Sequence, residues 1–168
     1  SLAWRFPPAA TAAQHWPMTN STSVQLASIR VISDDLPALV HFYEVLTGST
    51  PQYLTEDFVE FVTPSATFAL SAPERVAFIT ENTPRAGANN TAIVEFLVGD
   101  VEALYSRLRS VFGDELDVVQ EPTTMPWGNR SVLIRDPEGS LINLYTPVTP
   151  AGLKLQGNRT PKMLPDND

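Results

Sequence analysis

The sequence repeats one pattern twice, 65 residues apart. The stretch IRVISDDLPALVHFYEVLTG begins at Ile29, and VEFLVGDVEALYSRLRSVFG begins at Val94. Four of the twenty aligned positions are identical, and they fall where helices should begin, pack or end. The four pairs are Asp35 and Asp100, Ala38 and Ala103, Leu39 and Leu104, and Gly48 and Gly113. Agreement at these positions predicts two copies of one folding unit, rather than an accidental likeness within a generic α+β domain.

Each copy predicts a strand followed by a helix. An aspartate after the strand, Asp35 or Asp100, can accept hydrogen bonds from the free N–H groups at the helix start. Gly48 and Gly113 end the two helices, because glycine adopts the left-handed closing conformation at low cost. Apolar residues recur at helical spacing between these limits, namely Leu36, Leu39, Val40, Tyr43 and Leu46 in the first copy and Val101, Leu104, Leu108 and Val111 in the second.

Three strand candidates follow each helix, so each copy is predicted to be a β-α-β-β-β module in an α+β fold. The candidates are 52–54, 58–62 and 67–71 in the first module and 117–120, 129–135 and 141–145 in the second. The turns TPSA and DPEG occupy matching places, with proline supplying the φ angle that such turns need.

The length of 168 residues allows one domain with a sizeable core and is too short for two ordinary ones. We expect this domain to span 22–148, with module one at 24–81 and module two at 90–148. Residues 1–21 are expected to be an extension or an added leader. Residues 149–168, rich in Pro, Gly, Asn and Lys, are expected to form a C-terminal tail.

Composition excludes several classes of function. The chain has no cysteine, which rules out disulfides, thiolate nucleophiles and Cys-bound metals. Segment 22–148 holds seven arginines and no lysine against 17 acidic residues, a balance of −10, so nucleic acid is not expected as a partner. No apolar run is long enough to cross a membrane, and 1–21 lacks the pattern of a secretory signal. The cytoplasm is the expected location.

Several local motifs resemble those of a known family. The helix end HFYEVLTG, the Trp127–Gly128 pair, and the later run DPEG followed by Ile142–Asn143 are similar to the vicinal oxygen chelate superfamily. This superfamily includes glyoxalase I, extradiol dioxygenases and bleomycin-resistance proteins. The resemblance covers about 24–148 and implies a cup-shaped mixed sheet, half from each module, with helices outside. Family members commonly dimerise, with the cup inside one chain or shared between two, and we expect a homodimer.

The resemblance also implies where metal ligands would stand, on the first and last strand of each module. Those positions hold Ser28 and either Ala69 or Leu70 in module one, and Ile93 and Asn143 in module two. None is a strong metal ligand. Aliphatic side chains have no donor atom, and neutral oxygens bind a metal ion weakly unless charged ligands bind it as well. We therefore predict no metal and no cofactor. His15 lies in the N-terminal extension, and His41 is expected on the helix surface.

Strand alternation separates the residues that share a face with these positions from those that do not. The opposite face is wholly apolar, as expected under helices, whereas the shared face mixes polar and apolar residues, as expected of a ligand pocket. The predicted pocket face consists of Ser28, Arg30, Ile32, Ile93, Glu95, Leu97, Leu141, Asn143 and Tyr145.

Arg30 and Glu95 occupy equivalent positions in the repeat. We expect them at equivalent depths near the cup centre, where they pair or jointly hold a polar ligand, or alternatively serve as internal scaffolding. Trp127 is expected to form a stacking wall at the pocket mouth, or alternatively a core or dimer contact. Tyr53 and Glu60 are further pocket candidates.

The sequence alone is compatible with three functions. The favoured one is a metal-independent protein that binds a small molecule and sequesters an antibiotic or an aromatic metabolite, and the acidic surface favours a cationic ligand. The alternative is a lyase, isomerase or dioxygenase with non-standard residues, in which Glu95 could act as a general base. A nearby Arg30 would oppose that role by favouring the ionised carboxylate. The third is a structural or regulatory interaction module.

Overall fold

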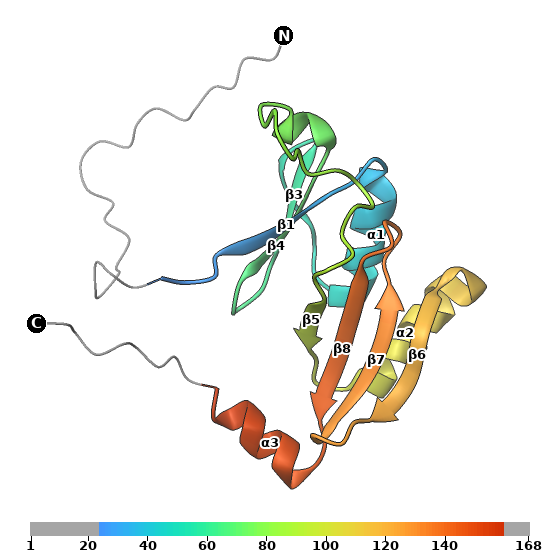
Figure 1. Ribbon diagram of the computed structural model, residues 1–168. Helices are drawn as coiled ribbons and strands as arrows, with labels where there is room; N and C mark the ends of the chain where they lie inside the picture. Colours follow the sequence, from blue (N-terminus) through green and yellow to red (C-terminus); the bar gives the residue numbers. More distant parts are fainter. Residues whose placement is uncertain (1–23, 160–168) are drawn as a thin grey trace, which may run out of the picture.

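The structure, a computed structural model, describes residues 24–159 (Figure 1). The predicted leader 1–21 and residue His15 lie outside the described residues. Module one consists of β1 (Ser28–Ile32), α1 (Leu36–Thr47), β2 (Gln52–Thr55), β3 (Phe58–Val62), β4 (Thr67–Ser71) and the short 3₁₀ helix η1 (Pro73–Val76). Module two consists of β5 (Val94–Leu97), α2 (Val101–Phe112), η2 (Gly113–Glu115), β6 (Asp117–Thr124), β7 (Asn129–Arg135) and β8 (Leu141–Pro147), followed by α3 (Pro150–Gly157).

The two modules have the same topology. Module one forms a four-stranded sheet in the order β1-β4-β3-β2, and module two forms one in the order β5-β8-β7-β6. In each sheet the first strand pairs parallel with the last, and the other pairs are antiparallel. The predicted α+β class with two β-α-β-β-β modules is confirmed. The sheets are two separate hydrogen-bonded units.

The helix boundaries follow the predicted capping residues. The Asp35 carboxylate accepts a hydrogen bond from the backbone N–H of Ala38 at 3.2 Å, and Asp100 accepts one from Ala103 at 3.0 Å. These bonds satisfy N–H groups that have no partner within the helix. Gly48 ends α1 in the left-handed conformation with φ of 65°, as predicted for a glycine at this position.

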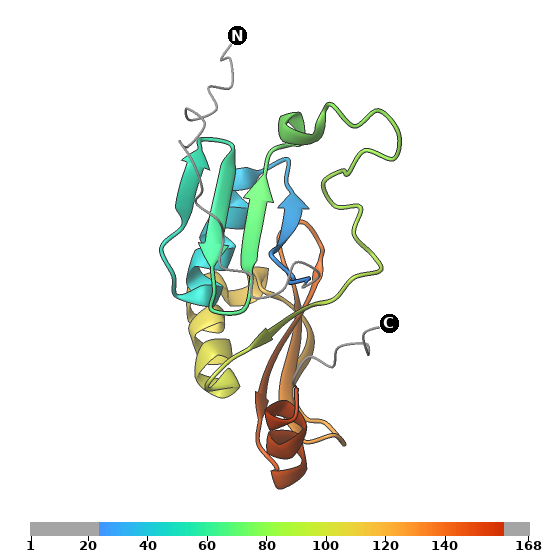
Figure 2. The same cartoon turned by 90° about the vertical axis from the view of Figure 1, so that its left-hand side faces the viewer.

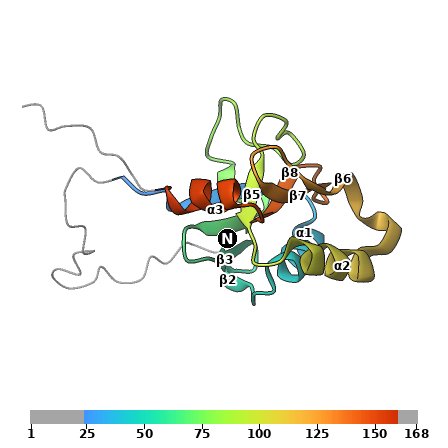
Figure 3. The ribbon, with the colours of Figure 1, turned by 90° about the horizontal axis from the view of Figure 1, so that it is seen from below.

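One hydrophobic core joins the modules. Its members come from both helices and from one face of each sheet, and they include Leu39, Tyr43, Leu108, Ile134 and Leu144. Seen from below, α1 and α2 lie side by side, with the second sheet on one side of them (Figure 3). When the first sheet is seen broadside, the second is seen nearly on edge (Figure 2). Because the helices occupy the space between the sheets, the remaining face of each sheet points outward, and the two outward faces have different directions.

The DPEG turn of module two attaches to module one. Asp136 accepts a hydrogen bond from the Tyr43 hydroxyl at 2.7 Å, and Glu138 accepts one from the Ser33 hydroxyl and one from the backbone N–H of Asp34. This turn therefore fixes the first strand and first helix of module one to the end of module two.

Part of the predicted C-terminal tail is helical. Thr149 caps α3 by accepting a hydrogen bond from the Gly152 N–H at 3.1 Å, and the Gly128 carbonyl accepts bonds from the N–H groups of Val148 and Thr149. In the described part of the chain, no helix has the length and apolar character needed to cross a membrane.

Candidate functional site

The outward faces of the two sheets carry four of the predicted site residues, Ser28, Arg30, Glu95 and Asn143. We call these faces polar face one and polar face two. Paired residues on neighbouring strands share a face, so the register defines both sets. Polar face one comprises Ser28, Arg30, Ile32, Thr67, Ala69, Ser71, Phe58, Glu60, Val62 and Gln52. Polar face two comprises Glu95, Leu97, Leu141, Asn143, Tyr145, Pro147, Asn129, Ser131, Leu133, Arg135, Asp117, Gln120 and Thr123.

The register decides between the two candidate ligand positions on β4. Ala69 pairs with Arg30, just as Asn143 pairs with Glu95, so Ala69 is the repeat equivalent of Asn143. Leu70 is fully buried and belongs to the core face. Within residues 24–159, no three His, Cys, Asp or Glu side chains gather as a metal-binding group would. The absence of a bound metal remains a prediction from the chemistry of these positions.

Three buried side-chain oxygens on the polar faces have no hydrogen-bond partner among residues 24–159. They are Ser71 Oγ on polar face one and Ser131 Oγ and Asn143 Oδ1 on polar face two. An unsatisfied buried polar atom costs about 1–3 kcal/mol, so such atoms mark places where a solvent or ligand group completes the bonding. Two of the three lie on adjacent strands of polar face two, where β7 pairs with β8.

Arg30 and Glu95 do not meet. Both are exposed, and the ion pairs of the described chain are Arg75 with Asp57, Arg109 with Asp114, and Arg130 with Glu102. Arg30 and Glu95 therefore make no ion pair with each other within residues 24–159, and their joint role in holding a ligand stays a prediction. The physical reason for the lack of an ion pair is the shared core, which places α1 and α2 between the sheets and turns the two faces outward.

Arg30 instead lies over an aromatic ring of its own face. Its guanidinium carbon is 5.6 Å from the centroid of Phe58, a geometry in which the ring quadrupole attracts a cation. Glu60 lies on the same face, since it pairs with Ala69. Sequence reasoning missed Phe58, although its spacing of two residues from Glu60 could have indicated it. Polar face one therefore offers an aromatic surface, a cation and a carboxylate.

Glu95 and Asn143 are direct register partners on polar face two. Next to them lies a second pair, Ser131 with Tyr145. The Tyr145 hydroxyl donates to Gln156 Oε1 at 3.2 Å and accepts from Arg159 at 3.1 Å, which attaches α3 and Arg159 to this face. Sequence reasoning missed Ser131, whose role appears only from its pairing across β7 and β8.

Three other candidates lie apart from this pair. Tyr53 pairs with Val59, which is fully buried on the core side, so Tyr53 lies at the sheet edge on the face opposite to Arg30. Ile93 precedes β5 and is exposed. Trp127 stands in the turn between β6 and β7, half exposed, and Gly128 beside it contacts the start of α3. The structure therefore does not bring Tyr53 to the other candidates.

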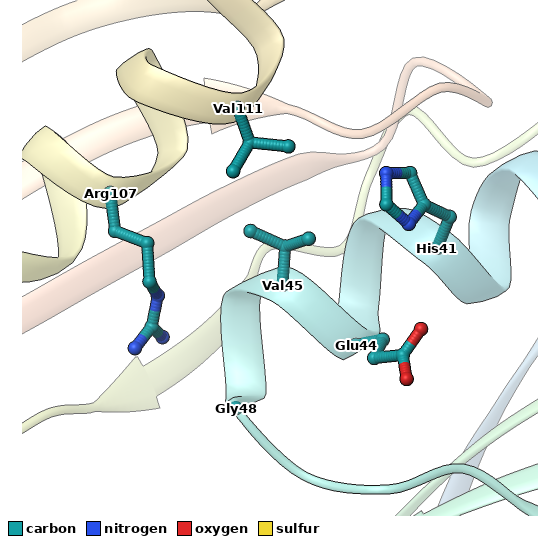
Figure 4. A pocket seen from close by; sticks show the side chains of 6 residues that line it. All are labelled: His41, Glu44, Val45, Gly48, Arg107 and Val111. Atoms are coloured by element: carbon teal, nitrogen blue, oxygen red, sulfur yellow. The ribbon is translucent and has the colours of Figure 1, made fainter.

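A hollow of about 350 Å³ lies elsewhere, between the outer surfaces of α1 and α2 (Figure 4). It is lined by His41, Glu44, Val45, Gly48, Arg107 and Val111. Arg107 uses its guanidinium to bond the Leu46 carbonyl at 3.1 Å, which stabilises the end of α1. His41 is exposed on the helix, as predicted, with its ring edge-on to Phe112 at 5.6 Å.

The sequence of residues 25–144 matches the family model described as the Glyoxalase/Bleomycin resistance protein/Dioxygenase superfamily. Solved structures with the same fold include a glyoxalase/bleomycin resistance protein/dioxygenase from Nocardioides, 20% identical, with a TM-score of 0.62 over 79% of this chain and 89% of that one. A glyoxalase-related enzyme from Fulvimarina pelagi is 17% identical, with a TM-score of 0.61 over 73% and 87%.

A lactoylglutathione lyase from Agrobacterium tumefaciens is 24% identical, with a TM-score of 0.56 over 74% of this chain and 95% of that one. No curated protein matches the sequence. Structural likeness at these identities establishes the fold, while the family model spans most of the chain, from the strand that carries Arg30 to the strand that carries Asn143. The chain belongs to the Glyoxalase/Bleomycin resistance protein/Dioxygenase superfamily.

Proposed function

We propose that this protein binds a small molecule on its polar faces without a metal ion, as a sequestering protein for an antibiotic or an aromatic metabolite. The proposal depends on one observation above all. Polar face two holds two buried oxygens without partners among the described residues, Ser131 Oγ and Asn143 Oδ1, beside the exposed carboxylate of Glu95. Such an arrangement suits a ligand that donates hydrogen bonds, and a cationic donor suits it best.

Polar face one supports the aromatic part of the proposal. Phe58 is half buried beneath Arg30, and a flat ligand ring can stack on the guanidinium plane or on the phenyl ring. The ligand-binding residues in this account are Ser28, Arg30, Ile93, Glu95, Trp127 and Asn143, extended by Phe58 and Ser131. Tyr53 is left out because its strand register places it on the other face.

Metal independence rests on residue chemistry. The four family ligand positions hold Ser28, Ala69, Ile93 and Asn143, which together offer two neutral oxygens and no charge. A divalent ion needs charged or imidazole ligands to compensate for its lost hydration. We also propose that the protein works in the cytoplasm as a homodimer, with neither nucleic acid nor membrane as a partner.

An enzyme of the same superfamily is the second candidate. Two of the similar solved structures carry enzyme names, a glyoxalase-related enzyme and a lactoylglutathione lyase. In this chain the residue suited to proton transfer is Glu95, which is exposed and has a polar neighbour in Asn143. An enzyme that works without a metal would use the Glu95 carboxylate as the general base that removes a proton from the substrate.

A thermal-shift screen separates the two candidates. Cationic aromatic compounds and antibiotics are tested against chelator-treated protein, and a ligand at 100 times its Kd should add about 2.7 kcal/mol of stability. Loss of the shift in N143L or in R30A, with retention in the helix-surface control R109A, supports binding at the polar face that carries the changed residue. Turnover of a screened compound that E95Q abolishes would favour the enzyme instead.

A further inference from the structure

We infer that polar face two takes a ligand with a cationic donor at one end and a carboxylate at the other, and that Arg159 receives the carboxylate. Arg159 follows α3, which attaches it to the face. This ligand class rests on the proposed function, since the same face binds the molecule. It adds Tyr145, Gln156 and Arg159 to the residues that a ligand meets.

The position of α3 beside β8 is set by a close backbone contact. A β-carbon on Gly152 would lie 2.5 Å from the carbonyl oxygen of Gly128, so the two backbones approach as closely as only glycine allows. Thr149 caps the helix next to this contact. Figure 1 shows α3 at the end of β8, on the opposite side of that strand from α2. The helix is therefore a wall held in place beside the sheet.

One side of α3 is turned toward polar face two. Gly152 and Gln156 are four residues apart and share a side of the helix. Arg159 lies three residues further, and its backbone N–H bonds the Gln156 carbonyl at 3.4 Å, which continues the turn. Gly152 is buried and Gln156 is half-buried, whereas Lys154 between them is exposed. The side chains of Gln156 and Arg159 therefore point the same way, toward the sheet.

Tyr145 connects this side of α3 to the polar face. Its hydroxyl contacts both Gln156 and Arg159, and only 4% of the residue is exposed. Its register partner on β7 is Ser131, which is 3% exposed and whose Oγ has no partner among residues 24–159. A buried polar atom without a bond marks a place where another polar group belongs. Such an atom lies at the end of the face where α3 brings Arg159.

Arg159 has donors that the described chain does not use. A guanidinium offers several N–H donors, and in Arg159 the bond to the Tyr145 hydroxyl comes from Nη1. Three other arginines pair with carboxylates within residues 24–159, and Arg159 does not. Arg135, at the far end of β7, donates to the Gly139 carbonyl at 3.2 Å. Because the planar guanidinium fork matches a carboxylate, Arg159 suits the anionic end of a ligand.

The cationic end of the ligand belongs at Glu95 and Asn143. These two residues are register partners, the Glu95 carboxylate is exposed, and the buried Asn143 Oδ1 has no partner in the described chain. Tyr145 follows Asn143 by two residues on the same face, so their backbones are roughly 7 Å apart along β8. A molecule of one or two aromatic rings with a charge at each end spans a distance of this order. A ligand with positive charge alone would be repelled by Arg159.

The test compares para-aminomethylbenzoate with its methyl ester, and a biphenyl analogue with its own ester to cover a longer span. The ester keeps the ammonium group and the ring and removes the anionic charge. Calorimetric titration of the wild type should give an affinity about tenfold or more higher for the acid, the effect of a hydrogen bond to a charged group. R159A should remove this preference without changing the affinity for the ester. E95Q should weaken acid and ester alike.

K154A is the matched control, because Lys154 is an exposed cation of the same helix and lies on its other side. This variant should keep the preference for the acid. Circular dichroism checks that all variants fold. An R159A variant that loses affinity for acid and ester by the same factor would show that Arg159 only holds α3 in place, and would overturn the inference. A preference for the acid that persists in R159A would overturn it too.

The outcomes distinguish this ligand class from the proposed function. A wild type that binds acid and ester equally well contradicts the carboxylate-binding role of Arg159 and leaves small-molecule binding intact. The same conclusion follows if neither compound pair binds while the thermal-shift screen finds other ligands. A wild type that binds no compound in either experiment contradicts both the ligand class and the proposed function.

Discussion

Tyr43 and Asp136 join the two modules through a buried hydrogen bond of 2.7 Å. Asp136 also accepts bonds from the backbone N–H groups of Glu138 and Ser140, each at 2.9 Å. Burial raises the pKa of Asp136, and burial together with the Asp136 charge raises the pKa of Tyr43 well above its usual value. The pair is structural, because it lies between α1 and the DPEG turn and away from both polar faces.

Replacing Tyr43 by phenylalanine should therefore weaken the module junction. Y43F leaves a buried carboxylate with one bond fewer, at a cost of about 1–3 kcal/mol in the free energy of unfolding. Urea denaturation measures this cost. The control is Y105F, because Tyr105 is half buried and makes no side-chain hydrogen bond within residues 24–159. Equal stability of Y43F and Y105F contradicts the role assigned to the bond.

Asp57 should make stability depend on pH in the acid range. Its carboxylate accepts hydrogen bonds from Arg75 Nε at 2.7 Å and from Thr55 at 2.7 Å, and the bonding to Arg75 lowers the pKa of Asp57. A lowered pKa in the folded state means that the carboxylate stabilises the fold above the ordinary aspartate pKa of about 3.9. This stabilisation is lost as the pH falls through the lower folded-state value.

The experiment compares the stability of the wild type with that of D57N between about pH 2 and pH 7. This range includes the ordinary pKa of an aspartate and the acid region below it. The difference in unfolding free energy should be largest near neutral pH and should shrink toward the acid end. D114N is the control, because Asp114 is fully exposed and its carboxylate lies 4.0 Å from Arg109. A difference between wild type and D57N that does not change with pH contradicts this assignment.

Asn143 should be more important for binding than for stability. Its buried Oδ1 has no partner within the described chain, so an apolar side chain of similar size removes an unsatisfied oxygen rather than a hydrogen bond. N143L should keep or raise the Tm while losing the ligand-induced shift. If N143L instead lowers the Tm as much as the loss of a buried hydrogen bond does, the Asn143 amide has a structural partner, and this prediction is contradicted.

Gly128 should be essential for the position of α3. Its φ is 98°, and a β-carbon there would lie 2.6 Å from the backbone nitrogen of Gly152. G128A should cost about 3 kcal/mol or more, from backbone strain and overpacking together. Gly139 provides the control, with a similar φ of 82° and no atom within 4 Å of the added carbon, so G139A should cost only about 1–2 kcal/mol. Hydrogen exchange of α3 should rise in G128A alone.

Most of the fold could be predicted from the sequence because its signals are local. Capping by Asp35 and Asp100 and helix termination at Gly48 depend on neighbouring backbone groups, which sequence spacing specifies. The strand candidates coincide with the observed strands except at their ends, where β2, β6 and β8 continue further than predicted. The helix after Thr149 was missed, since its docking depends on the contact with Gly128, far away in the chain.

The site was harder to predict. Alternation separated Arg30, Glu95 and Asn143 from the core face of their strands, because the side-chain period of two is a property of a single strand. The orientation of one module relative to the other depends on how both helices share a core. No local pattern specifies that packing, so the sequence could not show that Arg30 and Glu95 make no ion pair within the described chain.

The most direct test of the central claim is calorimetric titration of chelator-treated protein with the best compound from the thermal-shift screen, repeated on N143L and R30A. We expect unchanged affinity after the chelator and a loss of about tenfold or more in at least one of the two variants, equivalent to about 1.4 kcal/mol. Affinity that returns only when a divalent ion is added, or that neither variant changes, would contradict metal-free binding at the polar faces.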